Sequence, residues 1–377
     1  MWSSTSPHRY PIEDGPAQHR LVMAVMGSSS RLGGAERGTV ETAASDATRG
    51  GRWLIVLRDT GPGEVTRLCS ELGVDYALVK STRHVRRLIR KHRPDIVYVF
   101  GPRWSVPLRL ALAPSRLRNS RTPRRRPRFI VAQRGLDVWR RPWHNWADRY
   151  THLLVDRYVA NSHAAASTLV EQVGIPAEKV SVLHTGLGAD WFAAPSERRN
   201  RPGLPLRVIV VGNDRPEKAL DEAVAALAAV ADFPWEATIY TDVAERLASI
   251  VAAAGIEGRV RIVSKHRVTP VDYDAADLLL QTSVAESLPR AVLEAVARGV
   301  RVIATDVGDT AAIVPMSQLF PAGDRAAAAA MLRRFLQDQG VPQGLHSYWN
   351  TPQPVKVASE LVVVDAFRSI AHDRTRT

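Results

Sequence analysis

Cysteine is nearly absent from this sequence of 377 residues, and so are long apolar runs. The single cysteine, Cys69, excludes an internal disulfide and any cysteine cluster that would hold zinc or iron and sulfur. No stretch reaches the ~18 consecutive apolar residues of a membrane-spanning helix. Residues 1–19 carry proline, serine and acidic side chains where an export signal would have a basic end and an apolar stretch. We therefore expect a flexible leader at 1–19, no membrane span and a cytoplasmic protein.

Acidic residues are scarce in the first half of the chain only. Residues 1–200 hold 32 Lys and Arg against 17 Asp and Glu, whereas residues 201–377 hold 19 against 21. A basic half favours partners that carry phosphate, and composition leaves nucleic acid, anionic lipid and a phosphorylated substrate open. The densest cluster, at 116–128, has no aromatic residues on which bases could stack, and no nucleic-acid-binding motif is present. This cluster is either a solvated loop or a contact with an anionic membrane surface.

Hydrophobic residues make up 45% of the sequence and recur in two series of alternating strands and helices. Polar, proline-bearing residues at 197–205 separate the two series. Strands that alternate with helices of this length pair in parallel, so we predict an α/β fold with domains at 20–200 and 201–350. The predicted strands are 20–27, 53–59, 75–80, 95–101, 129–135, 157–162, 180–186, 206–212, 236–242, 260–264, 277–283 and 301–307. The main predicted helices are 65–72, 164–173, 217–230, 243–254 and 290–298.

Ligands bind at the carboxyl ends of the strands in open α/β folds, so the loop after strand 277–283 is informative. It leads into the helix at 290–298, whose amide end suits a phosphate. Glu286 lies in the loop and Glu294 lies eight residues further on, so both carboxylates can face one ligand. The alternative is that both glutamates only stabilise the start of a helix, an end that acidic residues favour.

Four segments together resemble the family 4 glycosyltransferases. These are GGAER near the N-terminus, residues 159–192, the segment VVGNDRPEKALDEAVAAL and the segment ESLPRAVLEAVARGVRVIATDVGD. The resemblance follows nearly the whole chain in order, and four motifs in the expected places are far more specific than one. It implies the GT-B fold, in which two Rossmann-like domains face each other across a cleft that holds a nucleotide sugar.

The resemblance assigns the two glutamates to the donor. It implies that Glu286 contacts the donor sugar and that Glu294 holds the ribose hydroxyls of the nucleotide. Backbone amides of the intervening loop would approach the sugar and the diphosphate, and Pro289 supplies none. The amides concerned belong to Ser287, Leu288 and Arg290.

A diphosphate leaving group gains charge as the glycosidic bond breaks, so fixed cations stabilise the transition state more than the ground state. The family has an arginine after the glycine of VVG and a lysine five residues later. This sequence has Asn213 in the first place and Lys218 in the second, with Arg215 between them. We expect Lys218 to meet the diphosphate, and Arg215 to replace the missing arginine if its loop turns it inward. The alternative for Lys218 is an exposed pair with Glu217 at the start of a helix.

The first domain carries two further candidate positions. Gly33 and Gly34 open a helix, where glycine lets a ligand approach the backbone closely, and the resemblance turns them toward the donor phosphates or the acceptor. Arg134 stands where many family members have a histidine, so this side chain can bind phosphate or a carboxylated sugar but cannot carry a proton. Thr185 and Gly188 also depart from the family pattern.

We expect no metal ion and no cofactor besides the donor substrate. Asp272, Tyr273 and Asp274 spell a D-x-D pattern, which binds a divalent metal in another glycosyltransferase fold, but they begin a helix of the second domain. The 11 histidines show no metal-ligand spacing.

A last amphipathic helix is predicted at 355–370, where Val357, Leu361, Val364 and Phe367 form one apolar stripe. The preceding loop of roughly 14 residues, at up to ~3.3 Å each, can reach a neighbouring domain. The resemblance implies that residues 351–377 cross back onto the first domain.

These features predict a retaining, metal-independent glycosyltransferase of the hexosyl type that uses a nucleotide-diphosphate sugar. The second domain would bind the donor, and the basic first domain would bind a lipid-linked or polysaccharide acceptor. We expect the protein to be cytoplasmic or peripheral at the inner face of a membrane. The alternative is a non-catalytic GT-B partner in a glycan assembly complex, which the departures at Asn213, Arg134 and Gly188 favour.

Overall fold

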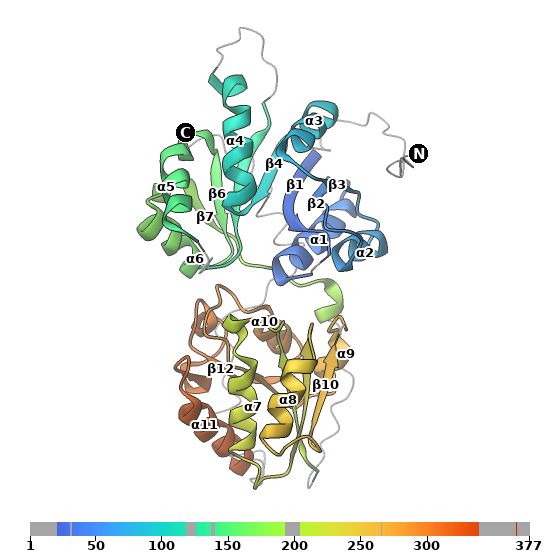
Figure 1. The fold of residues 1–377 in the computed structure, drawn as a ribbon, viewed down its shortest axis with the longest axis vertical. Helices are drawn as coiled ribbons and strands as arrows, with labels where there is room; N and C mark the ends of the chain where they lie inside the picture. The colour runs from blue at the N-terminus through green and yellow to red at the C-terminus, as the bar shows by residue number, and fades with distance from the viewer. Residues whose placement is uncertain are drawn as a thin grey trace. The chain divides into compact units, whose positions relative to one another are not determined.

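The computed structural model describes residues 21–30, 32–117, 126–136, 140–192, 204–264, 266–338 and 367. The chain divides into two compact units, Met1–Gly186 with Ala358–Thr377, and Leu187–Val357. Each unit contains one parallel sheet with helices packed on it, so the predicted α/β fold class is confirmed (Figure 1). Leu187 and Trp191 are buried in the core of the second unit, which therefore begins before residue 201.

The first unit has a seven-stranded parallel sheet in the order β3-β2-β1-β4-β5-β6-β7. Its central strands are rich in Val, Ile and Leu because both faces of the sheet are covered. Helices α1 and α2 pack on one face, and α3 and α4 pack on the other, as right-handed crossovers require. The strands are β1 (Leu21–Ser28), β2 (Arg52–Arg58), β3 (Tyr76–Val79), β4 (Ile96–Phe100), β5 (Arg128–Gln133), β6 (Arg157–Ala160) and β7 (Val180–Val182). The helices are α1 (Gly34–Ala47), α2 (Glu64–Glu71), α3 (Thr82–His92), α4 (Gly101–Leu117), α5 (Pro142–Thr151) and α6 (His163–Ser167).

The second unit has a six-stranded parallel sheet in the order β10-β9-β8-β11-β12-β13. Helices α7, α8 and α11 pack on one face, and α9 and α10 pack on the other. The strands are β8 (Leu206–Val211), β9 (Trp235–Thr241), β10 (Val260–Ser264), β11 (Leu278–Gln281), β12 (Arg301–Thr305) and β13 (Leu319–Phe320). The helices are α7 (Leu220–Ala228), α8 (Glu245–Ala253), α9 (Pro270–Asp274), α10 (Arg290–Ala297) and α11 (Arg325–Asp338).

Two predicted helices differ from the structure. The helix predicted from residue 217 begins only at Leu220, because Ala219 takes a left-handed conformation with φ of 44° and interrupts the helical path. The helix predicted at 164–173 is α-helical over His163–Ser167 only and continues as a π-helical turn over Thr168–Val173. Wider turns of this kind are rare and occur often beside functional sites.

The predicted C-terminal helix at 355–370 lies outside the described residues except for Phe367. This residue is helical and 3% exposed, and its ring centroid lies 5.6 Å from that of Trp53 and 5.0 Å from that of Tyr98. Phe367 therefore packs into the core of the first unit. The leader at 1–19 and most of the cluster at 116–128 also lie outside the described residues.

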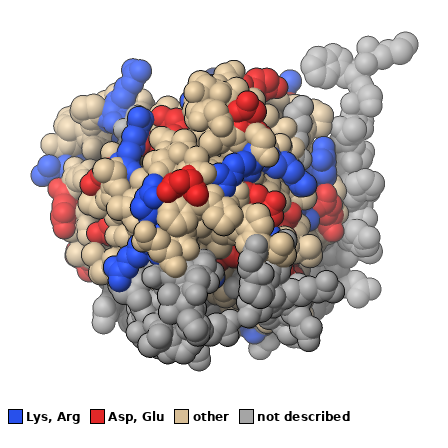
Figure 2. Space-filling view, turned by 90° about the horizontal axis from the view of Figure 1, so that it is seen from below, with Lys and Arg blue, Asp and Glu red and all other residues tan. Residues whose placement is uncertain are grey.

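Cys69 is buried in the first unit, and burial raises the pKa of its thiol to about 12. Among the described residues, no helix is both long enough and apolar enough to cross a membrane. On the face drawn in Figure 2, basic and acidic side chains are interspersed among uncharged ones.

Candidate functional site

Glu286 and Lys218 meet at the carboxyl ends of β11 and β8 in the second unit. The Lys218 Nζ bonds to the Glu286 Oε1, and the Ser283 Oγ donates to the same oxygen at 3.1 Å. The two charged side chains are 27% and 15% exposed, so the ion pair is shielded but within reach of a ligand. A carboxylate and an ammonium group lying together offer both an acceptor for sugar hydroxyls and a cation for phosphate.

The left-handed turn at Ala219 explains how Lys218 reaches a glutamate 68 positions away. The Thr282 Oγ1, at the end of β11, donates to the Ala219 carbonyl oxygen at 2.9 Å. The Val284 amide donates to the Glu217 carbonyl oxygen, also at 2.9 Å. These bonds join the turn before α7 to the loop after β11, so the strained backbone at Ala219 is held from both sides.

A second loop closes on Glu286 from β12. The Asp309 amide donates to the Ser287 carbonyl oxygen at 2.9 Å. Gly308 has φ of +56°, and a Cβ there would overlap the carbonyl oxygens of Glu286 and Ser287. Only glycine fits this approach, so the loop that carries Glu286 is fixed by the loop at 307–309.

Glu294 lies in α10, where it is 3% exposed. The Tyr273 hydroxyl of α9 donates to its Oε2 at 3.0 Å, and the Arg290 Nε donates to its Oε1 at 2.8 Å. A buried carboxylate held by two donors has a fixed orientation. Leu288 is buried in the core of the same unit.

Arg215 is not brought together with this pair. Its side chain is 45% exposed, and its Nη1 lies 3.9 Å from the Glu217 Oε1. Asn213 lies two residues before it, in the loop after β8. The involvement of Arg215 and Asn213 in a donor site therefore stays a prediction.

The D-x-D pattern has structural contacts within the second unit. Asp272 accepts hydrogen bonds from the Thr269 amide and from the Tyr240 hydroxyl, both at 2.8 Å. Burial acts to raise the pKa of Asp272, but the hydrogen bonds from His266, Thr269 and Tyr240 outweigh it and lower that pKa. Asp274 forms a two-bond ion pair with Arg298, at 2.9 and 2.7 Å. The residue between them, Tyr273, contacts Glu294, which sequence analysis did not foresee.

Arg134 and Thr185, both departures from the family pattern, lie together in the first unit. The Arg134 guanidinium donates to the Thr185 Oγ1 and to the Tyr98 hydroxyl, each at 3.3 Å. Its carbon lies 5.9 Å from the centre of the Phe100 ring. The carboxyl ends of β4, β5 and β7 thus build one cationic position.

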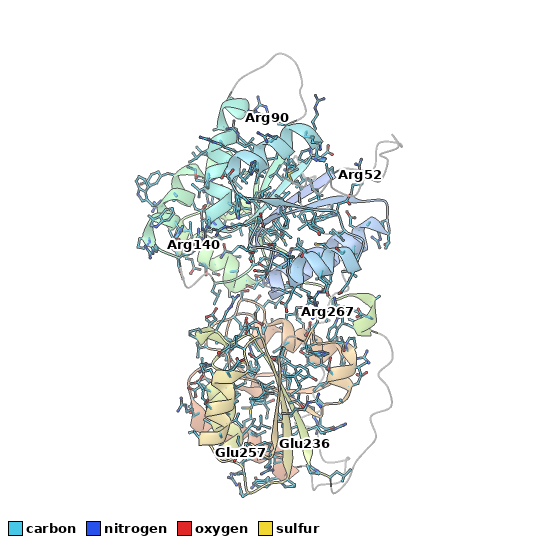
Figure 3. The ribbon with its side chains drawn as sticks, turned by 45° about the vertical axis from the view of Figure 1, so that its right-hand side comes forward. Arg52, Arg90, Arg140, Glu236, Glu257 and Arg267 are labelled. Carbon is cyan, nitrogen blue, oxygen red and sulfur yellow. The ribbon has the colours of Figure 1, made fainter. Side chains whose placement is uncertain are left out.

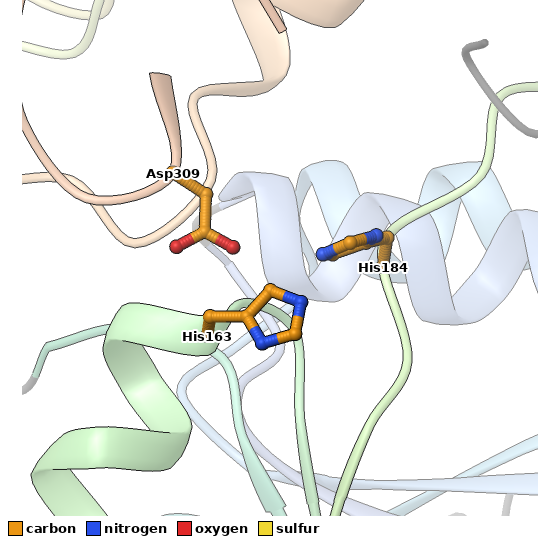
Figure 4. Close-up of side chains that lie close together, drawn as sticks. All are labelled: His163, His184 and Asp309. Atoms are coloured by element: carbon orange, nitrogen blue, oxygen red, sulfur yellow. The ribbon is translucent and has the colours of Figure 1, made fainter. Parts of the chain in front are cut away.

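Two histidines that sequence analysis did not single out lie at the same edge of this sheet. His163 begins α6, and His184 follows β7; their ring centroids are 5.6 Å apart in an edge-to-face arrangement (Figure 4). They are 21 residues apart, so no spacing rule could have joined them. Gly33 and Gly34 lie at the start of α1, where Gly33 occupies the N-cap position and the Glu36 carboxylate lies close to it.

The α/β fold with two parallel sheets matches solved structures of GT-B glycosyltransferases. A glycosyltransferase from Rickettsia africae has a TM-score of 0.73 at 17% identity, over 94% of this chain and 98% of that one. The Anabaena protein HepE, solved with UDP, has a TM-score of 0.69 at 18% identity, over 93% and 98%. At these identities the likeness concerns the fold.

Two glycosyltransferase family models match the chain, one over each unit. The family described as "Glycosyltransferase Family 4" matches residues 32–191, and "Glycosyl transferases group 1" matches residues 205–338. The chain belongs to this glycosyltransferase family, so the resemblance predicted from its motifs is confirmed.

Curated relatives match part of the chain. The D-inositol 3-phosphate glycosyltransferase of Salinispora arenicola is 31% identical over 215 residues, 49% of this chain and 48% of that protein. Its counterpart in Salinispora tropica is 34% identical over 214 residues, 49% of this chain and 44% of that protein. The chain spans about half the length of the curated relatives it matches.

Proposed function

We propose that this protein transfers a hexosyl group from a nucleotide-diphosphate sugar to a hydroxyl acceptor, with retention of anomeric configuration and without a metal ion. The observation that carries this proposal is the ion pair between Lys218 and Glu286, held in place by Ser283. Charge develops on the departing diphosphate, and a fixed ammonium group stabilises it without a metal. Glu286 then accepts hydrogen bonds from the hydroxyls of the donor sugar.

The nucleotide is bound by Glu294, whose two carboxylate oxygens accept from the ribose hydroxyls. The side chain is already oriented by Tyr273 and Arg290, so little ordering is needed when the nucleotide enters. Amides of Ser287, Leu288 and Arg290 approach the sugar and the diphosphate. The UDP in the Anabaena HepE structure supports a nucleoside diphosphate as the ligand of this fold.

Retention follows if the acceptor attacks the sugar on the face from which the diphosphate leaves. The bond from the anomeric carbon to the diphosphate oxygen breaks, and the bond to the acceptor oxygen forms. The proton of the acceptor hydroxyl passes to the departing diphosphate. In this scheme no side chain of the enzyme acts as a nucleophile.

The acceptor is anionic, either a lipid-linked or a polysaccharide glycan, and Arg134 binds its charged group. The cationic position at Arg134 and the basic composition of residues 1–200 support this choice. The names of the curated relatives include a phosphorylated inositol, which is consistent with an anionic acceptor. Such an acceptor would place the enzyme at the inner surface of a membrane.

The test has two stages. A thermal-shift screen of UDP, GDP, ADP and their sugars identifies the donor, because a ligand at a hundred times its dissociation constant stabilises by about 2.7 kcal/mol. That donor is then incubated with inositol phosphate and with polyprenyl-phosphate-linked acceptors, with EDTA present. We expect a product whose anomeric configuration, read by NMR, equals that of the donor.

The non-catalytic alternative predicts a different result. The exposed Arg215 is the observation that favours it, because its guanidinium lies near Glu217 and is not held in an ion pair with Glu286 as Lys218 is. Tight donor binding without turnover on any acceptor would support that alternative and overturn the proposed transfer. Activity that EDTA abolishes and Mg²⁺ restores would overturn metal independence alone.

A further inference from the structure

Large aromatic side chains cover the outward side of α5 in the first unit. Trp143, Trp146 and Tyr150 are 57%, 65% and 62% exposed, and Leu153 in the following turn is 76% exposed. Their spacing of three, four and three residues places them on one face of the helix. The rings of Trp146 and Tyr150 lie 4.5 Å apart. We call these four residues the aromatic patch; exposed apolar groups gathered in this way mark a binding surface.

The opposite side of α5 is polar and buried, which fixes the direction of the patch. The Asp148 carboxylate, 3% exposed, forms ion pairs with Arg109 of α4 and with Arg140. Arg109 is fully buried and also donates to the Tyr158 hydroxyl at 3.1 Å. Turning the aromatic residues inward would break this buried network and leave charges unpaired, which is strongly unfavourable. The helix therefore presents its aromatic face outward as a stable feature of the fold.

A strongly basic helix belongs to the same face of the sheet. Helix α4 packs against both α5 and α3, so the three helices form one continuous layer (Figure 1). Helix α3 contains five Lys and Arg residues and no acidic residue. Arg83, Arg87, Arg90 and Lys91 are exposed and form no ion pair with another described residue, and Figure 3 labels Arg90 on this helix. The layer thus combines aromatic residues with uncompensated positive charge.

We propose that the first unit docks on an anionic lipid bilayer through the aromatic patch of α5 and the cations of α3. Tryptophan and tyrosine have an apolar ring and a polar atom, so they suit the headgroup level of a bilayer. The cations of α3 meet the lipid phosphates, where each contributes to membrane attraction. A second copy of this chain would bring like charges together and fits the surface less well. This docking deepens the proposed function, in which the enzyme works at a membrane surface. It rests on that proposal only for its biological purpose, because lipid binding itself requires no sugar transfer.

The test is co-sedimentation of the full chain with vesicles of phosphatidylcholine alone and with vesicles containing equimolar phosphatidylglycerol. We expect binding to the anionic vesicles only, weakened by salt. The triple variant Trp143→Ala, Trp146→Ala, Tyr150→Ala should bind at least about tenfold more weakly. The variants Arg87→Ala and Arg90→Ala should each lose about fivefold. A matched control, Val271→Ala with Met316→Ala, removes exposed apolar residues of the second unit and should bind like the wild type.

Several outcomes would overturn the proposal. Equal sedimentation of the wild type and the triple variant would remove the aromatic patch from the surface, and absence of wild-type sedimentation would reject docking altogether. A wild-type dimer that the triple variant dissociates, without vesicle binding, would assign the patch to a second copy instead. Circular dichroism and the unfolding temperature check that the variants fold. Calorimetric donor binding should be unchanged in the triple variant, so a failure of docking and a failure of the transferase proposal are distinguishable.

Discussion

The two units share one frame and differ in what their loops carry. In each sheet the fourth strand of the unit lies next to the first, as β4 next to β1 and β11 next to β8. In each unit an aspartate directly before the fourth strand accepts a hydrogen bond from the first strand. Asp95 accepts from the Leu21 amide at 3.1 Å, and Asp277 accepts from the Arg207 amide at 2.9 Å. The loops at the carboxyl ends of the strands differ: the second unit joins Lys218 to Glu286, whereas the first unit gathers Arg134 and two histidines. The repeated frame supports the sheet, and the loops determine the chemistry.

The largest expected effect on activity distinguishes Lys218 from Arg215, two cations of the same loop. Lys218→Ala should lower turnover by about 100- to 1000-fold and weaken donor binding far less, because the charge it meets grows as the bond breaks. Arg215→Ala, the matched change three residues earlier, should lose less than about tenfold because its guanidinium is exposed. Steady-state kinetics with the identified donor measures both variants. Equal losses in turnover and binding at Lys218 would make it a simple binding residue.

The next effect concerns nucleotide affinity. Glu294→Ala should weaken binding of the nucleoside diphosphate by about 10- to 100-fold, since two hydroxyls lose a charged acceptor. Titration calorimetry measures the affinity, and the unfolding temperature reports any loss from the buried site. Tyr273→Phe serves as the control, because it removes one hydrogen bond to Glu294 and keeps the ring. Unchanged affinity in Glu294→Ala would remove this residue from the nucleotide site.

A stability measurement tests the contact between Asp277 and Arg207 that joins the first and fourth strands of the second unit. Burial acts to raise the pKa of Asp277, but its hydrogen bonds from Arg207 outweigh this and lower that pKa. Because this pKa is lowered, the ionised carboxylate stabilises the fold at pH values above the unfolded-state pKa of ~4. This stabilisation is lost as the pH falls through the lower pKa of the folded state. Asp277→Asn should therefore cost about 1–2 kcal/mol at neutral pH, and less below pH ~4.

Denaturant unfolding at several pH values measures this difference. Asp232→Asn is the matched control, since Asp232 forms an exposed ion pair with Arg333 and should be replaceable without measurable change. A cost for Asp277→Asn that does not vary with pH would show that ionisation of this carboxylate is irrelevant to the frame.

The smallest effect sharpens the contrast between the loops of the two units. Arg134→Lys keeps the charge but loses the planar guanidinium that reaches both Tyr98 and Thr185. We expect the KM for the acceptor to rise about three- to tenfold while the affinity for the nucleotide stays the same. A change in nucleotide affinity would contradict the assignment of Arg134 to the acceptor.

Patterns of local sequence predicted the strands well and some helices poorly. Strand β10 and helix α10 fall within one residue of their predicted bounds, because apolar runs flanked by glycine or proline mark both. Helix α4 was not predicted, since its sequence contains three prolines that argue against a helix, and packing in the first unit overrides this local preference. Helix α7 begins late, at Leu220, after the left-handed Ala219, whose carbonyl oxygen accepts a hydrogen bond from Thr282, a contact that no local pattern contains.

The sequence named the residues of the candidate site, and their roles stay predictions. The family resemblance indicated Lys218, Glu286 and Glu294, yet their partners Ser283 and Tyr273 are ordinary residues without a motif of their own. The contact between Arg134 and Thr185 joins positions 51 residues apart, so only the folded sheet reveals it.

The central claim is that the donor nucleotide binds to the second unit between Lys218 and Glu294. A crystal structure of the full chain with the nucleoside diphosphate selected by the thermal-shift screen tests it most directly. We predict electron density for the diphosphate against Lys218 and the loop at 286–290, with both ribose hydroxyls at hydrogen-bond distance from Glu294. Density for the nucleotide at Arg134 in the first unit, with the Lys218–Glu286 pair unchanged, would contradict the account.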